Sequence, residues 1–393
     1  MCQWAHAYSM SLEDIKVVLD TFKSVFPHIS IWYTMPSDMI MIGSCEEVNA
    51  DYLELVKDYD IPGVREDLQW LNIREPAALL SCHLLDEEGV GRLVAGSLIN
   101  TDNRPILEFS VPRSLYLYIN ISNHNMLMSY KTEEFPKMRN FDQQRVASRA
   151  SFWYHMGVAY DHKIMPDEAC RHYEKAISVD KGFAPAYVGL ALNLYKGEKV
   201  LRAVKNLEKA IALDPSGADA YYNLAQIYHS QELPDEAISN YESAIKVSPQ
   251  PWRYQQKLAD LLVEYRDYSA AIRQYEAALK GRVNKPRILY RMAKAYRAAG
   301  MIDNAIGRIQ EAIAIDPSSA SLYEELGDLH KAQKEYEKAA SAYKKLIELE
   351  SDSGLAHLKL SYVYRLQGDL SSFRKEARKA VELGELSHEA ETP

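Results

Sequence analysis

The chain has 393 residues, of which 47% are apolar and 26% charged, and its net charge is −9. These values are typical of a globular protein and argue against a wholly disordered chain. Because there is no basic excess to displace counterions from a phosphate backbone, the composition argues against nucleic-acid binding. No apolar run approaches ~18 residues, so the sequence predicts no membrane-spanning helix.

The cysteine pattern and the start of the chain bear on the compartment. The four cysteines are far apart and show no CxxC spacing; they are Cys2, Cys45, Cys82 and Cys170. This pattern fits a reducing compartment and argues against a zinc site. The first ten residues lack the basic and apolar regions of a signal peptide. We therefore expect a cytoplasmic protein.

The first predicted element is a helix that begins at Ser11 and ends before Pro27. Acidic residues fill its first turn, and its apolar residues recur at helical spacing. They are Ile15, Val18, Leu19, Phe22, Val25 and Phe26. Two strands are predicted next, at 28–34 and 39–43, because both stretches are rich in β-branched, aromatic and apolar residues and flank a turn-forming Pro-Ser-Asp.

The remainder of residues 1–149 predicts mostly short helices. Residues 47–98 read as helical with proline and glycine breaks, and 101–105 as a polar loop. A strand-like run at 106–111, a helix at 114–129 and a polar linker at 130–144 follow. Two neighbouring strands are too few for a sheet with both faces covered, so this segment reads as part of a larger α/β fold.

Residues 150–384 repeat one motif seven times at a period of 34 residues, without insertions. The units are 150–183, 184–217, 218–251, 252–285, 286–319, 320–353 and 354–384. The eighth position of each unit is small: Gly157, Ala191, Ala225, Ala259, Ala293, Gly327 and Ser361. The twentieth position is alanine except at Phe373, and the twenty-seventh is alanine except at Leu346. Such a period is typical of stacked repeats.

Each unit reads as two helices joined by a short polar turn. Large residues at positions 4, 7, 11 and 24 form the apolar stripe, and the small ladder lets helix axes approach closely. Pro215, Pro249 and Pro317 end second helices. Because one pair cannot bury its own apolar face, the units are predicted to stack into an α-solenoid.

This array resembles the tetratricopeptide repeat family over residues 150–384. The resemblance implies a mainly α fold in which the first helices line a concave groove that holds a partner peptide or helix. It implies binding rather than catalysis.

The N-terminal segment resembles the C-terminal part of spermidine synthase-like proteins over residues 1–120. The resemblance is carried by short blocks, which are Cys2-Gln3-Trp4, Tyr8, Thr21-Phe22, Val25-Phe26-Pro27-His28, Trp32, Gly43-Ser44, Asn100 to Pro105, Leu107-Glu108-Phe109, Pro112-Arg113 and Leu115-Tyr116. It implies an incomplete Rossmann-like, methyltransferase-type sheet, then a linker at 121–149, the array, and a tail at 385–393.

The residues that this family uses to bind its nucleotide and to catalyse its reaction are missing from the segment. Its nucleotide binds a glycine-rich strand-to-helix turn, and residues 1–149 hold no such motif after a strand. Gln3 matches a residue near the family's polyamine pocket, and Tyr33 to Ser37 resemble an altered pocket loop. No catalytic residue, cofactor or metal is predicted. The segment is the tail of a longer protein, a remnant that caps the first repeat, or a chance resemblance.

Two other features have structural explanations. His155, His162 and His172 lie close in sequence, but a metal site needs three or four converging ligands, so we expect packing or surface histidines. The mixed charges from Glu324 to Glu350 have helical spacing and predict a solvated face.

One surface of the array carries a candidate binding site. Positions 2, 5, 9 and 12 of the first helices form what we call the first-helix face. In the third to fifth units it holds Asp219, Tyr222, Gln226, His229, Arg253, Gln256, Asp260, Val263, Arg287, Tyr290, Lys294 and Arg297. Four cations with two tyrosines predict capture of an acidic peptide or C-terminal carboxylate: Tyr222, Arg253, Arg287, Tyr290, Lys294 and Arg297. A hydrated surface is the alternative.

The carboxylate clamp of chaperone-tail binders is absent, because its slots hold Tyr154, Val158, Val188 and Leu192. Two functions remain open. The first is a protein-interaction scaffold that is not itself catalytic. The second is the C-terminal portion of an aminopropyltransferase fused to repeats, whose nucleotide-binding half is missing from this chain.

Overall fold

A computed structural model describes most of the chain. The described residues are 2–6, 12–35, 38–47, 50–70, 76–97, 127, 129–130, 138–140, 142–162, 164–281 and 284–384. The loop predicted at 101–105, the strand at 106–111, nearly all of the helix at 114–129 and the tail at 385–393 lie outside these residues. So does much of the linker predicted at 130–144.

The described strands form a four-stranded sheet in the order β1-β3-β2-β4. Their bounds are β1 Cys2–His6, β2 His28–Met35, β3 Asp38–Ser44 and β4 His83–Leu85. The strands predicted at 28–34 and 39–43 are present as β2 and β3, paired in the register Ile31 to Met41. Both residues are buried, so this side of the hairpin faces the core.

Strands β1 and β4 correct the expectation of only two neighbouring strands. β1 pairs with β3, and β4 pairs with β2 inside the stretch 47–98 that was predicted to be helical. All described pairs are antiparallel, whereas a Rossmann-like sheet is mostly parallel. The Rossmann-like assignment therefore stays a prediction. Because β1 and β2 both run antiparallel to β3, they share one direction.

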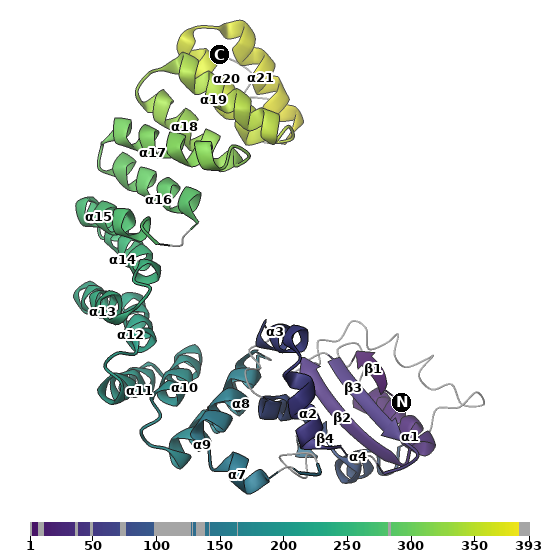
Figure 1. The fold of residues 1–393 in the computed structure, drawn as a ribbon. Helices are drawn as coiled ribbons and strands as arrows, with labels where there is room; N and C mark the ends of the chain where they lie inside the picture. Colours follow the sequence, from purple (N-terminus) through teal and green to yellow (C-terminus); the bar gives the residue numbers. More distant parts are fainter. Residues whose placement is uncertain are drawn as a thin grey trace. The chain divides into compact units, whose positions relative to one another are not determined.

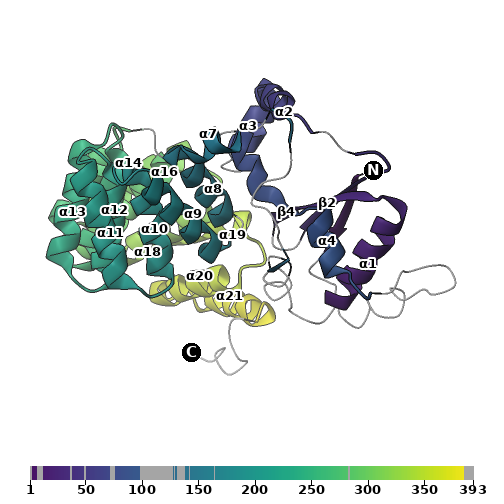
Figure 2. The same cartoon turned by 90° about the horizontal axis from the view of Figure 1, so that it is seen from below.

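Helix α1, Leu12–Val25, connects β1 to β2 and packs on the sheet. Gly43 of β3 lies under its aromatic residues: a Cβ there would come within 2.5 Å of the Phe22 ring and 2.7 Å of Phe26. The absence of a side chain at Gly43 thus allows α1 to approach closely. Helix α4, Glu87–Leu93, contacts β2 and β4, and Figure 2 shows both helices beside the strands.

The first unit contains further short elements before the helix pairs. They are α2 Tyr52–Tyr59, α3 Pro62–Trp70, η2 Pro76–Cys82, α4 Glu87–Leu93 and α7 Gln143–Ala147. Asp51 caps α2 by accepting a hydrogen bond from the amide of Leu53, and Asp86 caps α4 through the amide of Gly89. Asparagine and aspartate favour such positions because their oxygens satisfy free helix amides.

Residues 150–384 form fourteen helices in seven successive pairs (Figure 1). The first helices are α8 Ala150–His162, α10 Ala184–Lys196, α12 Ala218–Ser230, α14 Trp252–Glu264, α16 Lys285–Ala298, α18 Ala320–Ala332 and α20 Gly354–Gln367. The second helices are α9 Pro166–Val179, α11 Val200–Leu213, α13 Pro234–Val247, α15 Tyr268–Ala278, α17 Ile302–Ile315, α19 Tyr336–Leu349 and α21 Leu370–Glu382. The predicted mainly helical repeat architecture is confirmed.

The small-residue ladder is buried, as its spacing predicts. The alanines at the twentieth position are fully buried: Ala169, Ala203, Ala237, Ala271, Ala305 and Ala339. Phe373 and Leu346, which depart from the ladder, are also buried. At Gly157 and Gly327 an added Cβ would lie within 2.6 Å of the ring of Tyr173 or Tyr343. The tyrosine at position 24 thus takes the space that a side chain at position 8 would occupy.

Every turn within a helix pair has a left-handed residue at position 15. These residues are Ile164, Glu198, Glu232, Arg266, Gly300, Lys334 and Gly368, with φ between 57° and 80°. Only two are glycine, which adopts this backbone without steric strain. The other five adopt the left-handed backbone conformation at a cost of about 1–2 kcal/mol each, which the packing of the helix pair offsets.

The chain divides into two compact units, Met1–Asp214 and Pro215–Pro393. In the first unit, the N-terminal segment packs against the first helix pair, because α8 contacts η2. The second unit contains the five pairs from α12 to α21 and all six residues of the predicted binding site. The domain limits predicted at residues 120, 149 and 384 stay predictions.

Candidate interaction surface on the first helices

The six predicted residues lie on three successive first helices of the second unit. Tyr222 is on α12 and Arg253 is on α14. The other four are on α16, at spacings of three, four and three residues: Arg287, Tyr290, Lys294 and Arg297. Residues at this spacing share one side of a helix. The sequence pattern therefore places a row of three cations and one tyrosine along α16.

Tyr222 is a packed residue rather than a free stacking surface. Its ring centroid lies 5.3 Å from that of Tyr254 and 5.9 Å from that of Tyr241. Burial raises the pKa of Tyr222, and the nearby Arg253 partly opposes this effect. Tyr222 therefore supports the surface beside Arg253.

Three of the four predicted cations remain open to a partner. Arg253, Arg287 and Lys294 are exposed, and within the part of the chain that the structure describes none of them takes part in an ion pair. The Lys294 ammonium lies 5.5 Å from the ring centroid of Tyr290. This cation–π contact positions the ammonium on the face without neutralising it.

Arg297 is committed to a neighbouring helix. Its guanidinium lies 3.0 Å from a carboxylate oxygen of Glu325 on α18, whose side chain is only 7% exposed. Burial raises the pKa of Glu325, while Arg297 and Lys294 act in the opposite direction. Arg297 therefore compensates a buried carboxylate and is less available to a partner than the other three cations, while the predicted site as a whole stays a prediction.

The acidic residue on the same face of α14 is neutralised as well. Asp260 accepts a 2.6 Å hydrogen bond from the Tyr275 hydroxyl and pairs with Arg291 of α16. The same arrangement recurs on α18, where Asp328 accepts from Tyr343 and pairs with Lys359 of α20. The sequence analysis missed these bridging cations. The sequence pattern that would have revealed them is an acidic residue at position 9 of one unit together with a basic residue at position 6 of the next unit.

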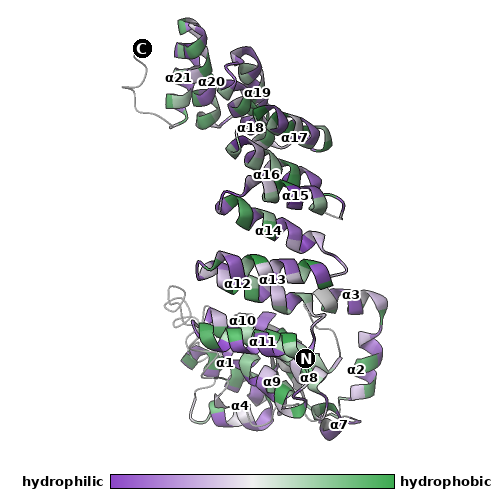
Figure 3. Ribbon diagram, turned by 90° about the vertical axis from the view of Figure 1, so that its left-hand side faces the viewer, coloured by the Kyte–Doolittle hydropathy of each residue, from purple (hydrophilic) through white to green (hydrophobic). Residues whose placement is uncertain are grey.

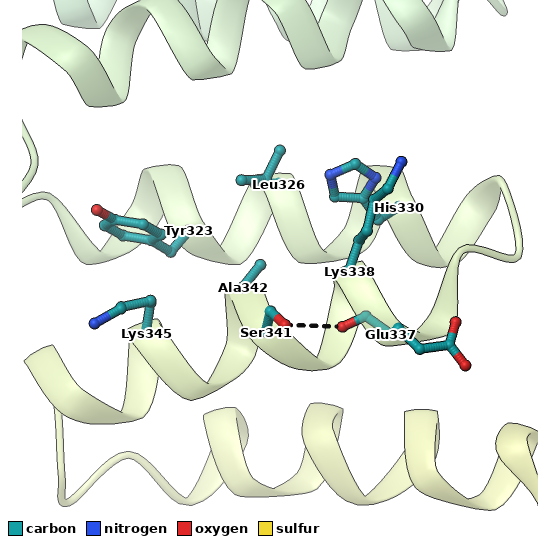
Figure 4. Close-up of a pocket in the computed structure, with 8 residues that line it drawn as sticks. All are labelled: Tyr323, Leu326, His330, Glu337, Lys338, Ser341, Ala342 and Lys345. Carbon is teal, nitrogen blue, oxygen red and sulfur yellow. Dashed lines mark hydrogen bonds between the residues drawn. The ribbon is translucent and has the colours of Figure 1, made fainter.

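A surface pocket in the second unit lies elsewhere. It measures about 380 Å³ and is formed by α18 and α19 (Figure 4). Tyr323, Leu326 and His330 line one side, and Lys338 and Lys345 lie opposite. The two lysines already pair with Glu335 and Glu348. The pocket shares no residue with the first-helix face.

Of the three histidines that lie close in sequence, His172 is a packing residue. His172 is buried, stacks on Tyr160 at 4.8 Å and makes a 2.7 Å hydrogen bond with the carbonyl of Glu168. Among the described residues no cluster of His, Cys, Asp and Glu is arranged to hold a metal ion. Likewise, no helix in the described part is both long enough and apolar enough to cross a membrane. Gln3 is exposed on β1.

Comparisons with known proteins identify the repeats. One family model, described as tetratricopeptide repeat, matches residues 188–251, 257–320 and 324–388. A second model with the same description matches residues 150–183. No curated protein matches the chain.

Several solved structures resemble the array. The C-terminal part of a TPR repeat-containing protein from Cytophaga hutchinsonii has 16% identity and a TM-score of 0.53, with 61% of this chain and 96% of that chain covered. YrrB, described as a TPR protein with an unusual peptide-binding site, has 26% identity and a TM-score of 0.41, covering 47% and 95%. PilF of Pseudomonas aeruginosa has 20% identity and a TM-score of 0.40, covering 53% and 94%.

The stacked helix pairs and their exposed first-helix face define a helical-repeat scaffold for protein interactions. The chain belongs to the tetratricopeptide repeat family through residues 150–388. The likeness of residues 1–120 to spermidine synthase-like proteins stays a prediction, as does the aminopropyltransferase hypothesis built on it. The described residues of that segment provide no specific observation in its favour.

Proposed function

We propose that the second unit holds an acidic segment of a protein partner on its first-helix face. The observation that carries this proposal is the set of three exposed cations on α14 and α16, Arg253, Arg287 and Lys294, which form no ion pair among the described residues. The acids on the same face of α14 and α18 are already neutralised by Arg291 and Lys359.

The chemistry of these side chains favours carboxylates. An arginine guanidinium binds a carboxylate through two parallel hydrogen bonds, and a lysine ammonium adds a point charge. Because the chain as a whole has a net charge of −9, general electrostatic attraction does not draw in an acidic peptide. Binding of such a peptide therefore requires a local cationic surface.

A binding measurement with matched charge reversals tests the proposal. A fluorescein-labelled peptide of alternating Glu and Gly is titrated with the full chain, and its anisotropy is followed at low salt. Arg287→Glu with Lys294→Glu is expected to weaken binding at least about tenfold. Arg273→Glu with Lys280→Glu changes the net charge equally, at exposed positions on α15 and just after it, and should leave binding nearly unchanged.

Equal losses in the two double variants would show that only net charge matters. Unchanged binding in Arg287→Glu with Lys294→Glu would remove this surface from consideration. Circular dichroism of each variant establishes that the helices are retained.

A further inference from the structure

Helix α20 presents large apolar side chains at the positions where α16 presents cations. Leu355, Tyr362 and Leu366 are 42%, 44% and 42% exposed. Their spacing of seven and four residues puts them on one side of the helix, within about 40° of each other. Leu355 and Tyr362 occupy positions 2 and 9, which are Arg287 and Lys294 on α16. The first-helix face thus changes character from α16 to α20.

Cations flank this apolar cluster. The Arg365 guanidinium lies 4.7 Å from the Tyr362 ring centroid, and the Lys331 ammonium of α18 lies 6.0 Å from it. Arg365 is exposed and takes part in no ion pair within the described residues. A cation beside an exposed aromatic ring suits an occupant that carries both a carboxylate and apolar side chains.

The face is continuous between the two regions. On α18 the same positions hold Ser321 and Asp328, and Asp328 is neutralised by Lys359 at 2.7 Å. The contact of Lys331 with the Tyr362 ring joins α18 to α20 on this side. An occupant that leaves Lys294 therefore meets Ser321 and two acids, Glu324 and Asp328, that both pair with Lys359 at 2.7 Å.

We propose that the partner is a single bipartite segment, with acidic residues on α14 and α16 and large apolar residues, flanked by an acid, on α20. This inference rests on the proposed function and names the partner's chemistry more narrowly. Charge complementarity favours this occupant over a purely apolar one, because a purely apolar occupant would leave the exposed Arg365 without a counter-ion, whereas Lys331 already pairs with Asp328.

The experiment compares two labelled peptides on the full chain. One carries an acidic block alone, and the other carries the same block, a Gly-Ser spacer of varied length and a Leu-Phe-Glu-Leu block. The second peptide is expected to bind about tenfold more tightly at its best spacer length, because two half-exposed leucines become buried. Leu355→Ser with Leu366→Ser is expected to remove this gain while leaving the affinity for the acidic peptide unchanged.

Matched controls separate the failures. Leu201→Ser with Leu233→Ser alters exposed leucines on other surfaces and should preserve the gain. Absence of a gain at every spacer length, or a gain unaffected by Leu355→Ser with Leu366→Ser, overturns the bipartite inference. A changed oligomeric state in Leu355→Ser with Leu366→Ser, without a change in peptide affinity, would also overturn it, because the leucines would then serve self-association. Failure of the proposed function is a separate result: the acidic peptide alone would bind equally to Arg287→Glu with Lys294→Glu.

Discussion

The Lys359 ammonium on α20 lies 2.7 Å from a carboxylate oxygen of Asp328 on α18 and so joins two consecutive helix pairs. The other oxygen of Asp328 accepts hydrogen bonds from the Tyr343 hydroxyl at 2.6 Å and from Lys331 at 3.0 Å. Asp328 therefore links its own pair internally and to the next pair. In repeat proteins, stability depends on such nearest-neighbour interfaces.

Asp328→Asn should destabilise the second unit by about 1–3 kcal/mol. The asparagine amide lacks the negative charge that pairs with Lys359, and it weakens the hydrogen bond from the Tyr343 hydroxyl. Urea unfolding followed by circular dichroism measures the change. Asp352→Asn, at an exposed turn, serves as the control and should have little effect. Equal unfolding midpoints for wild type and Asp328→Asn would refute the bridging role.

The contribution of Asp328 should also depend on pH. Burial tends to raise the pKa of Asp328, but hydrogen bonds from Lys359, Tyr343 and Lys331 outweigh it and hold the pKa below the ordinary 3.8. Because the folded-state pKa is lowered, the ionised group stabilises the fold above pH ~4, and this contribution is lost as the pH falls through the folded pKa. The stability gap between wild type and Asp328→Asn should thus be constant from pH 8 to 5 and shrink below pH 4. A gap that widens with acid would contradict this sign.

Two glycines in the second unit should respond to alanine in opposite directions. At Gly327 a Cβ would lie 2.4 Å from the ring of Tyr343, whereas nothing lies within 4 Å of a Cβ at Gly307. Gly327→Ala is expected to destabilise by about 1–3 kcal/mol through overpacking. Gly307→Ala, inside α17, is expected to stabilise by about 0.5–1 kcal/mol through its higher helix propensity. We expect the melting temperature of Gly327→Ala to lie below that of wild type and the melting temperature of Gly307→Ala to lie above it. Shifts of the same sign in both variants would contradict this packing.

Ile164→Gly should stabilise the first helix pair. Ile164 has φ of 59° and its side chain is 82% exposed, so the β-branched residue holds strained backbone while burying little surface. Glycine relieves the strain, and its larger loss of backbone entropy leaves a net gain of roughly 0.5–1 kcal/mol. Comparison with Gly300, which already occupies the equivalent position in the fifth unit, shows that the turn accepts this residue. A lower melting temperature for Ile164→Gly would contradict the prediction.

Glu325→Gln should strengthen binding of the acidic peptide. The change removes a carboxylate next to Lys294 and releases Arg297 from its 3.0 Å ion pair. We expect an increase in affinity of roughly two- to fivefold, the effect of one partly screened charge pair. Glu311→Gln breaks a similar ion pair with Arg308 on α17, a second helix, and should leave the affinity unchanged. Equal gains in both variants would show a dependence on net charge alone.

The sequence predicted the array well because its information is local and periodic. The helix pairs follow from the spacing of small and large residues, and the hairpin of β2 and β3 from two adjacent β-rich runs. Strands β1 and β4 were missed because they are short and pair with distant residues, as Trp32 does with His83. Their assignment depends on long-range pairing that no local pattern reveals.

The candidate surface could be predicted only in part. Spacing alone places Arg287 and Lys294 on one side of α16. It does not show that Arg297 reaches Glu325 in the next unit, because that contact depends on the orientation of two side chains in different repeats. The left-handed turns at position 15 were missed for a similar reason: five of the seven residues are not glycine and give no turn signal of their own.

Photo-cross-linking tests the central claim most directly. An acidic peptide with a diazirine at one end is bound to the full chain and irradiated, and the labelled residues are identified by mass spectrometry. The account predicts labels on α12, α14 and α16, concentrated around Arg253, Arg287 and Lys294, and their loss in Arg287→Glu with Lys294→Glu. Labels confined to the second helices α13, α15 and α17, or to the N-terminal unit, would contradict it.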